Sequence, residues 1–423
     1  MNRATIVRLV AGMVLVISTW ACGENDDATV NDSVEPAAQA ARNIIFIQGD
    51  GMGRQHIRAG RIFRNGPDEP LTFEKISPPA LIDTSSLSTN PLFPNLTATD
   101  SAAAATAFAT GERVKNGTIS TRPNGDILTT IAEISRTMGK AVGVISTSYI
   151  HDASPSAFVA HNLDRDTYPD LIEDMYRRTK PEIMLGGGRS TWEDLGTIDA
   201  ATAEGYTFAG TASELAAIDL DHTERVLGLF TGDLEATDNL LINLLMPIMA
   251  GESLSLEAGR DGSQTDPRLP ELLAAGLDRL EQNPAGFFLF VENELIDTLS
   301  HLAGGLDAIL GEGSGDLVLP LLVEEVALLD ETVETALTWI GRQGLPEETL
   351  LIVAADHETG GLEVESGDYQ KGDIVDVRWT FGLGHTSKET AIFSTGFGSD
   401  RVHEAFLNTD IFEAMRAGQA GEP

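Results

Sequence analysis

Short apolar runs alternate along the chain with longer stretches in which apolar and polar residues mix at helical spacing. Each apolar run has the length of a strand and is followed within a residue or two by glycine, serine or an ionisable residue. Strands that alternate with helices are typical of α/β proteins whose central sheet is largely parallel. The predicted central strands are residues 43–48, 141–146, 182–185, 286–291 and 349–355.

The polar residues directly after these runs are the first candidates for chemistry, because open α/β sheets bind ligands outside the carboxyl ends of their strands. Asp50 follows the first run between two glycines, and Asp356 with His357 follows the last run. The glycines around Asp50 do not make a dinucleotide fingerprint, since the third glycine is replaced by Arg54. Capping of the next helix is the alternative role for Asp50.

A serine and two histidines add to these candidates. Ser101 stands before an alanine run that predicts a strong helix, so its hydroxyl would face the positive end of the helix dipole. That position suits a nucleophile that carries a phosphoryl group, but a helix cap is equally compatible with it. Asp297 and His301 would share one helical face and either bind one metal or form a surface hydrogen bond. His385 lies in a glycine-rich loop.

Together these candidates supply nitrogen and oxygen ligands from several strand ends, plus a serine at a helix start. Hydrolysis assisted by two or more metal ions requires such a set. The remaining histidines have no carboxylate at metal spacing, and we do not expect them to be ligands. They are His56, His151, His161, His222 and His403.

The composition is that of a globular protein, but the charge is strongly acidic. The 423 residues are 42% hydrophobic, and 28 Lys and Arg stand against 65 Asp and Glu, which gives a formal net charge of −37. This charge would repel a polyanion, so no nucleic-acid partner is expected. It would also repel a phosphate substrate, unless cations gathered at one place override the overall field.

The N-terminal region carries targeting signals. Residues 1–21 predict an export signal, because arginines precede an apolar stretch at residues 9–20 that is too short to span a bilayer. Cys22, the only cysteine, stands where bacterial lipoproteins carry a lipid, so an anchor is predicted; otherwise Cys22 is lost with the signal or remains a free thiol. Residues 22–41 predict a flexible acidic tether, and the expected location is the periplasm or the cell surface.

The rest of the chain, residues 42–423, is predicted to form one catalytic domain. The stretch at about residues 190–270 has helical segments such as residues 235–250 but no cluster of chemical groups. We therefore expect a variable insertion or a peripheral lobe there.

Seven motifs resemble the alkaline phosphatase family in order and spacing, over most of residues 43–396. The resemblance implies a three-layer α/β/α sandwich with a large, mostly parallel central sheet. It also implies a metal-dependent hydrolase of small phosphate monoesters. The motifs are residues 49–53, 99–107, 151–155 and 186–189, Glu292 with Asp297 and His301, residues 355–357, and His385 with Thr386.

The resemblance implies a role for each matching residue. Ser101 would form a phosphoseryl intermediate, and Arg165 would clamp the phosphate oxygens with its forked guanidinium. Without the resemblance, Arg165 would be interpreted as an ion pair with its acidic neighbours. Two Zn²⁺ ions and one Mg²⁺ ion would be bound. The implied ligands are Asp297, His301 and His385 for one zinc, Asp50, Asp356 and His357 for the other, and Asp50, Ser154 and Glu292 for magnesium, with Asp152 in its outer shell.

Two other functions are compatible with these residues. A phosphodiesterase of the same superfamily would share the metals, and a phosphate-binding lipoprotein without turnover would share the ligands. Arg165 and the site at Ser154 and Glu292 favour a monoesterase. Thr298 stands where relatives often have lysine, histidine or tryptophan, which leaves the pH optimum open. A homodimer is compatible with the resemblance, but the resemblance identifies no interface.

Overall fold

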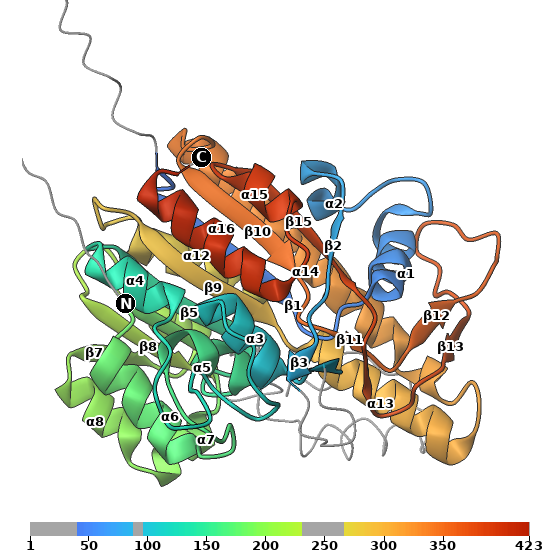
Figure 1. Ribbon diagram of the computed structural model, residues 1–423, viewed down its shortest axis with the longest axis horizontal. Coiled ribbons are helices and arrows are strands. Elements are labelled where there is room, and N and C mark those ends of the chain that lie inside the picture. Colours follow the sequence, from blue (N-terminus) through green and yellow to red (C-terminus); the bar gives the residue numbers. More distant parts are fainter. Residues whose placement is uncertain (1–39, 88–95, 231–265, 423) are drawn as a thin grey trace, which may run out of the picture. The chain divides into compact units, whose positions relative to one another are not determined.

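The computed structural model describes residues 40–87, 96–230 and 266–422 (Figure 1). The predicted signal peptide, Cys22 and nearly all of the predicted tether lie outside these residues. So does the helix predicted at residues 235–250. No helix in the described ranges is both long and apolar enough to cross a membrane.

The described residues form a central sheet of nine strands in the order β2-β15-β10-β1-β9-β5-β6-β8-β7 (Figure 1). Neighbouring strands from β10 to β7 are parallel, whereas β15 pairs antiparallel with both β10 and β2. The five predicted strands are the adjacent strands β10, β1, β9, β5 and β6, so the prediction of a mostly parallel sheet is confirmed. The nine strands are β1 (Asn43–Gly49), β2 (Ala80–Ile82), β5 (Ala141–Tyr149), β6 (Ile183–Gly187), β7 (Tyr206–Ala209), β8 (Arg225–Leu229), β9 (Phe287–Asn293), β10 (Thr349–Ala354) and β15 (Thr390–Gly396).

Both faces of the sheet are apolar, because successive side chains of a strand point to opposite faces. In β1, Ile45 and Ile47 enter one buried core, whereas Ile44 and Phe46 enter a second core on the other face. Helices cover both cores, so the predicted three-layer α/β/α sandwich is confirmed (Figure 1). The first core is covered by α1 (Arg54–Asn65), α12 (Leu269–Leu280), α13 (Leu295–Leu310) and α14 (Leu319–Gln343), and the second by α3 (Ser101–Thr110), α4 (Ile131–Thr137), α5 (Ala153–Val159), α6 (Tyr168–Asp174) and α16 (Asn408–Ala420).

The stretch expected to form an insertion is in part an extension of the sheet. β7 and β8 lie within it and pair parallel with each other, and β8 pairs with β6. Short helices connect these edge strands: α7 (Arg189–Asp194), α8 (Thr197–Ala203) and α9 (Ala212–Ala217). β7 was not predicted because only its first and last residues are buried, which leaves no apolar run. β8 is as long as β6 and has buried apolar residues at positions 226–229, but it was not predicted either.

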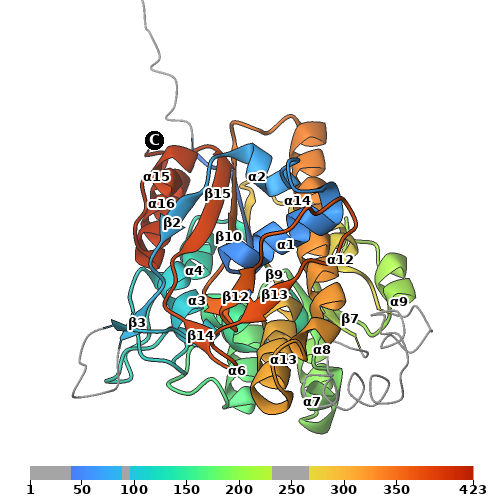
Figure 2. The same cartoon turned by 90° about the vertical axis from the view of Figure 1, so that its right-hand side faces the viewer.

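Two small two-stranded sheets connect the loops that follow β10. β11 (Glu358–Thr359) pairs with β14 (His385–Thr386), and β12 (Leu362–Val364) pairs with β13 (Val377–Trp379) beside α1 and α13 (Figure 2). The register of the first pair places Thr359 opposite His385. The glycine-rich loop that carries His385 is thereby held next to the end of β10.

Candidate active site

The carboxyl ends of three neighbouring strands bring buried acids together. Asp50 directly follows β1, Asp356 follows β10 by two residues, and Glu292 lies near the end of β9. Because these strands are adjacent in the order β10-β1-β9, their ends meet at one edge of the sheet. Each of the three acids is at most 2% exposed. Burial of several carboxyl groups at one place is costly unless cations or protons neutralise them.

The turn after Asp50 requires glycine. Gly51 has a φ of +67°, and a Cβ there would lie 2.5 Å from Asp297 Oδ1. Its backbone N–H donates a hydrogen bond to Asp356 Oδ1 at 3.1 Å. The next helix, α1, has Gly53 rather than Asp50 at its N-cap. Asp50 is therefore not a helix cap, and its carboxylate is turned toward the other acids.

Asp50, Asp356 and His357 form a group that we call the Asp356 cluster. One potential ligand atom from each lies within 4.8 Å of the others. Buried oxygens Oδ1 of Asp50 and Oδ2 of Asp356 have no hydrogen-bond partner. Burial, followed by the neighbouring carboxylates, raises the pKa of both aspartates well above the usual range. A divalent cation bound between the two aspartates would pair with the buried oxygens and offset the repulsion between the carboxylates.

His357 has its lone pair directed into this cluster. The Thr359 hydroxyl donates to the Asp297 carboxylate, which can only accept, so His357 Nδ1 must donate to Thr359 Oγ1 at 3.2 Å. His357 Nε2 is then unprotonated, 3.4 Å from Asp50 Oδ1 and 3.3 Å from Asp356 Oδ2. Burial lowers the pKa of His357, which keeps the ring neutral as a metal ligand must be.

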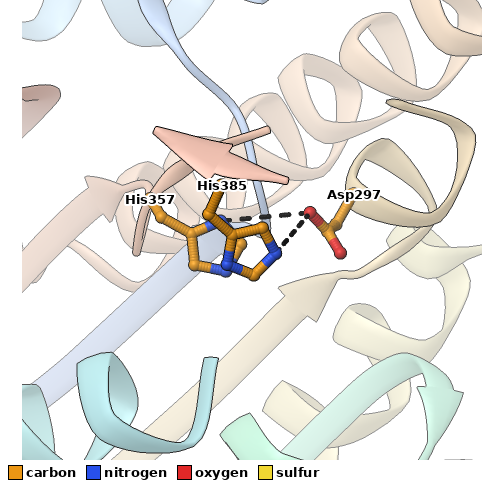
Figure 3. Close-up of side chains that lie close together, drawn as sticks. All are labelled: Asp297, His357 and His385. Atoms are coloured by element: carbon orange, nitrogen blue, oxygen red, sulfur yellow. Dashed lines mark ion pairs between the residues drawn. The ribbon is translucent and has the colours of Figure 1, made fainter. Parts of the chain in front are cut away.

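A second group, the His385 cluster, consists of Asp297, His301 and His385. Figure 3 shows Asp297 facing His385 and His357, with Asp297 Oδ1 3.7 Å from His385 Nε2. His301 Nε2 lies 3.1 Å from Asp297 Oδ2 and 3.0 Å from His385 Nε2. His385 Nδ1 donates to the Thr99 carbonyl at 2.7 Å, so its Nε2 is unprotonated in the neutral ring and carries the lone pair that a metal would need. Burial alone would raise the pKa of Asp297, but the nearby histidines hold it far below its usual range.

Ser101 occupies the first position of α3, and its neighbour Asp100 performs the capping. The Asp100 side chain accepts from Ala103 N at 2.9 Å and from Gly117 N at 2.8 Å. The Ser101 hydroxyl is therefore not needed as a cap, and its Oγ lies 3.3 Å from His357 Nε2. A serine at a helix start, beside a potential cation site, can be deprotonated and can attack a phosphorus atom.

A third group, the Glu292 cluster, consists of Glu292, Ser154, Ser146 and Gln48, and its potential metal ligands are oxygen atoms. Ser146 Oγ donates to Glu292 Oε2 at 2.6 Å, and Gln48 Nε2 donates to Ser154 Oγ at 3.0 Å and to Glu292 Oε1 at 3.3 Å. Burial raises the pKa of Glu292 to about 7, against the opposing effect of these hydrogen bonds. Gln48 and Ser146 were not predicted as site residues, although each is a polar residue at the end of an apolar run in the sequence.

Arg165 is paired with two acids at the N-terminal ends of helices. Its Nη2 lies 3.0 Å from Asp152 Oδ1 and its Nη1 3.5 Å from Asp100 Oδ2. Asp152 and Asp100 occupy the N-caps of α5 and α3. Arg165 was alternatively expected to form an ion pair with the acids next to it in the sequence. Its ion-pair partners among the described residues instead come from elsewhere in the chain. The guanidinium is thereby fixed near the helix that carries Ser101.

Four of the five histidines outside these clusters have other partners, whereas Nε2 of His403 is buried without a hydrogen-bond partner in the described part of the chain. His56 is buried and hydrogen-bonded to Ser300 Oγ at 3.0 Å, and His151 accepts from Trp192 Nε1. None of the five was expected to be a metal ligand, and none belongs to a group of three potential ligands within the described residues. His161 and His222 nevertheless have carboxylate partners, because the fold brings distant acids to the first and Asp219 lies three residues before the second. His161 lies 3.1 Å from Asp174 and 3.6 Å from Glu133, and His222 lies 2.9 Å from Asp219.

The donor atoms fit divalent cations. The Asp356 and His385 clusters offer imidazole nitrogens with carboxylate oxygens, which suits zinc. The Glu292 cluster offers oxygens only, which suits the harder magnesium ion. The fold and this edge of the sheet thus define the class of protein: an α/β enzyme with a serine beside a metal centre.

Comparison with known proteins agrees with this class. The family model described as alkaline phosphatase matches residues 41–375. Alkaline phosphatase 4 of Bacillus subtilis (strain 168) is 29% identical over 86% of this chain and 71% of its own length. Alkaline phosphatase H of Pseudomonas aeruginosa (strain UCBPP-PA14) is 30% identical over 75% and 69%. The structure of alkaline phosphatase from the Antarctic bacterium TAB5 superposes with a TM-score of 0.69, at 22% identity, over 91% of this chain and 100% of that chain.

This chain belongs to the alkaline phosphatase family. It is an enzyme with phosphomonoesterase activity, and the family's dependence on metal agrees with the clustered ligands. Among the solved structures similar to it is a variant of the TAB5 enzyme with Mg bound in the M3 site.

Proposed function

We propose that the enzyme hydrolyses phosphate monoesters through a phosphoseryl intermediate on Ser101. The observation that carries this proposal is the Ser101 hydroxyl at the start of α3, 3.3 Å from His357 Nε2 and not needed as a helix cap. The Ser101 oxygen would form a bond to phosphorus as the alcohol leaves. Water would then attack the phosphoserine and release inorganic phosphate, with Ser101 regenerated.

The chain's own residues would prepare this reaction. The helix dipole of α3 favours negative charge on the Ser101 oxygen and on the transferred phosphoryl group. Arg165 would use its two nitrogens to orient two phosphate oxygens, and Asp152 and Asp100 keep the guanidinium in place for this. Its positive charge also opposes the overall acidity of the chain at the point where the substrate binds.

Three metal ions would complete the site. The His385 cluster would hold one zinc, the Asp356 cluster a second, and Asp50 with Ser154 and Glu292 a magnesium ion with Asp152 in its outer shell. When bound, the metals would supply positive charge that stabilises anionic oxygens during the displacement. The lone pairs on His385 Nε2 and His357 Nε2 support the division between the two zinc sets, because the Nδ1 atom of each ring is engaged elsewhere.

Comparison of a monoester with a diester tests this function against the phosphodiesterase alternative. We expect kcat/KM for 4-nitrophenyl phosphate to exceed that for bis(4-nitrophenyl) phosphate, because a diester has fewer free oxygens for Arg165. Arg165→Lys should lower kcat/KM for the monoester by about 10- to 100-fold, since the two-nitrogen contact of the guanidinium is worth roughly 1.5–3 kcal/mol. It should therefore reduce the ratio of kcat/KM for the monoester to kcat/KM for the diester. Arg177→Lys, at an exposed surface pair, is the control. A higher rate on the diester would refute the monoesterase.

We also propose that the protein is exported and anchored by a lipid on Cys22. The support is the sequence alone: an export signal at residues 1–21 followed directly by the chain's only cysteine. The full-length protein expressed in a bacterial host should partition into the detergent phase, and Cys22→Ser should move it to the aqueous phase with unchanged phosphatase activity. Equal partitioning of both proteins into the aqueous phase would contradict the anchor.

A further inference from the structure

Glu294 is a buried acid near the three clusters but is not one of the proposed metal ligands. Glu294 lies between β9 and α13, at the N-cap of that helix, and is 8% exposed. Its position is fixed by the backbone, because Glu294 N donates to Thr147 Oγ1 at 2.9 Å. The preceding residue, Asn293, is held by Glu325 of α14 through a hydrogen bond of 2.8 Å. The side chain of Glu294 therefore starts from a rigid point at the edge of the sheet.

Only one oxygen of the Glu294 carboxylate has a hydrogen-bond partner. Its Oε1 accepts a hydrogen bond from the Thr298 hydroxyl, one helical turn later. Its Oε2 is buried without a hydrogen-bond partner. Among the described residues, Asp50 Oδ1 and Asp356 Oδ2 have the same property, and both belong to a cluster with the donor set of a metal site. An unpartnered buried carboxylate oxygen is costly and calls for a positive partner.

Glu294 is anchored beside the Glu292 cluster: it follows Glu292 by two residues, and Thr147, which binds its N–H, is the neighbour of the Ser146 that donates to Glu292 Oε2. Besides burial, which is the largest cause, the carboxylates of Asp297, Asp152 and Glu292 raise the pKa of Glu294. Glu294 in turn is among the acids that raise the pKa of Asp50. Glu294 therefore lies at the strand ends that carry the Glu292 cluster, among the acids of the proposed metal sites.

We propose that Glu294 is an additional acidic group of the magnesium site, which accepts a hydrogen bond from a water molecule bound to the cation. The inference rests on the proposed function, because that function places magnesium at Glu292. Magnesium retains several waters in proteins, and these waters need acceptors around the ligands. Thr298 would act as the positioning residue, since its hydroxyl holds Oε1 and leaves Oε2 for the hydrated ion.

Magnesium titration of the zinc-loaded protein by isothermal calorimetry tests this role. Glu294→Gln keeps the shape of the side chain and the bond to Thr298 but removes the charge. We expect it to weaken magnesium binding about 10-fold or more, the usual effect of losing a group that supports the ligands. Thr298→Val should weaken it less. Glu325→Gln is the matched control. Glu325 is a buried glutamate of α14 whose Oε2 is already paired with Asn293 at the end of β9, so this variant should bind magnesium as the wild type does.

Thermal unfolding separates this role from a purely structural one. Without metal, Glu294→Gln should be at least as stable as the wild type, because it removes one charge from an acidic cluster, whereas added magnesium should raise its melting temperature less. Wild-type magnesium affinity in Glu294→Gln, or no magnesium binding by the wild type, would overturn the proposal. Neither result depends on Ser101, so loss of the proposed catalytic mechanism would be seen separately, in the activity of Ser101→Ala.

Discussion

Ser101→Ala is expected to lower kcat for a simple aryl phosphate by on the order of 10³-fold or more, as removal of a covalent nucleophile does in other hydrolases. The loss should lie in the chemical step, because no other described side chain holds a hydroxyl at the start of α3 beside His357. Alanine is a good helix former, and Asp100 already caps the helix. The melting temperature should therefore stay close to that of the wild type.

Two further measurements make this result specific. Thr110→Ala removes a hydroxyl from the other end of α3, where it bonds to the Thr106 carbonyl, and should keep near wild-type activity. Mass spectrometry of the acid-quenched wild type should locate a phosphate on Ser101 during turnover. If Ser101→Ala retained full activity, or if phosphate were found on another residue, the phosphoseryl mechanism would be wrong.

Removal of metal by a chelator is expected to abolish activity and to destabilise the protein. The buried acids at the ends of β1, β9 and β10 would then lie close together without a counter-charge. A metal present at 1,000 times its Kd contributes about 4 kcal/mol to stability. For a domain of this size, its loss should lower the melting temperature by at least about 5 °C. Added zinc and magnesium should restore both properties.

Asp356→Asn is the variant that connects this effect to the structure. It removes one carboxylate from the Asp356 cluster, so it should reduce both the activity and the metal-dependent rise in melting temperature. Asp219→Asn, at an exposed pair with His222, should leave both unchanged. If chelator left the melting temperature of the wild type unchanged, bound metal would not stabilise the fold at the ends of β1, β9 and β10.

The same acids explain how an anionic substrate is compatible with a chain of net charge −37. Asp50, Glu292, Asp297 and Asp356 are gathered at one edge rather than spread over the surface, and there they can concentrate divalent cations. Arg165 is held nearby by Asp152 and Asp100. The local field at the site can then be positive although the chain as a whole is acidic.

Much of this protein could be predicted from its sequence, because the signals are local. Five apolar runs predicted five adjacent strands, since a parallel strand buried on both faces must be apolar along its whole length. The ordered motifs around Asp50, Ser101 and His357 indicated the family. The edge strand β7 was missed because its two middle residues are not buried, so it lacks such a run, whereas the apolar residues of β8 were present in the sequence but not recognised as a strand.

Other features were decided only by the tertiary structure, because they depend on groups that are far apart in the sequence. The choice of Asp100 over Ser101 as the helix cap, and of Asp152 over adjacent acids as the partner of Arg165, follows from packing between α3, α5 and their loops. The lone pair on His357 depends on hydrogen bonds that connect it through Thr359 to Asp297. The unpartnered oxygen of Glu294 could be identified only in the folded chain, because burial and the lack of a partner are properties of the assembled site.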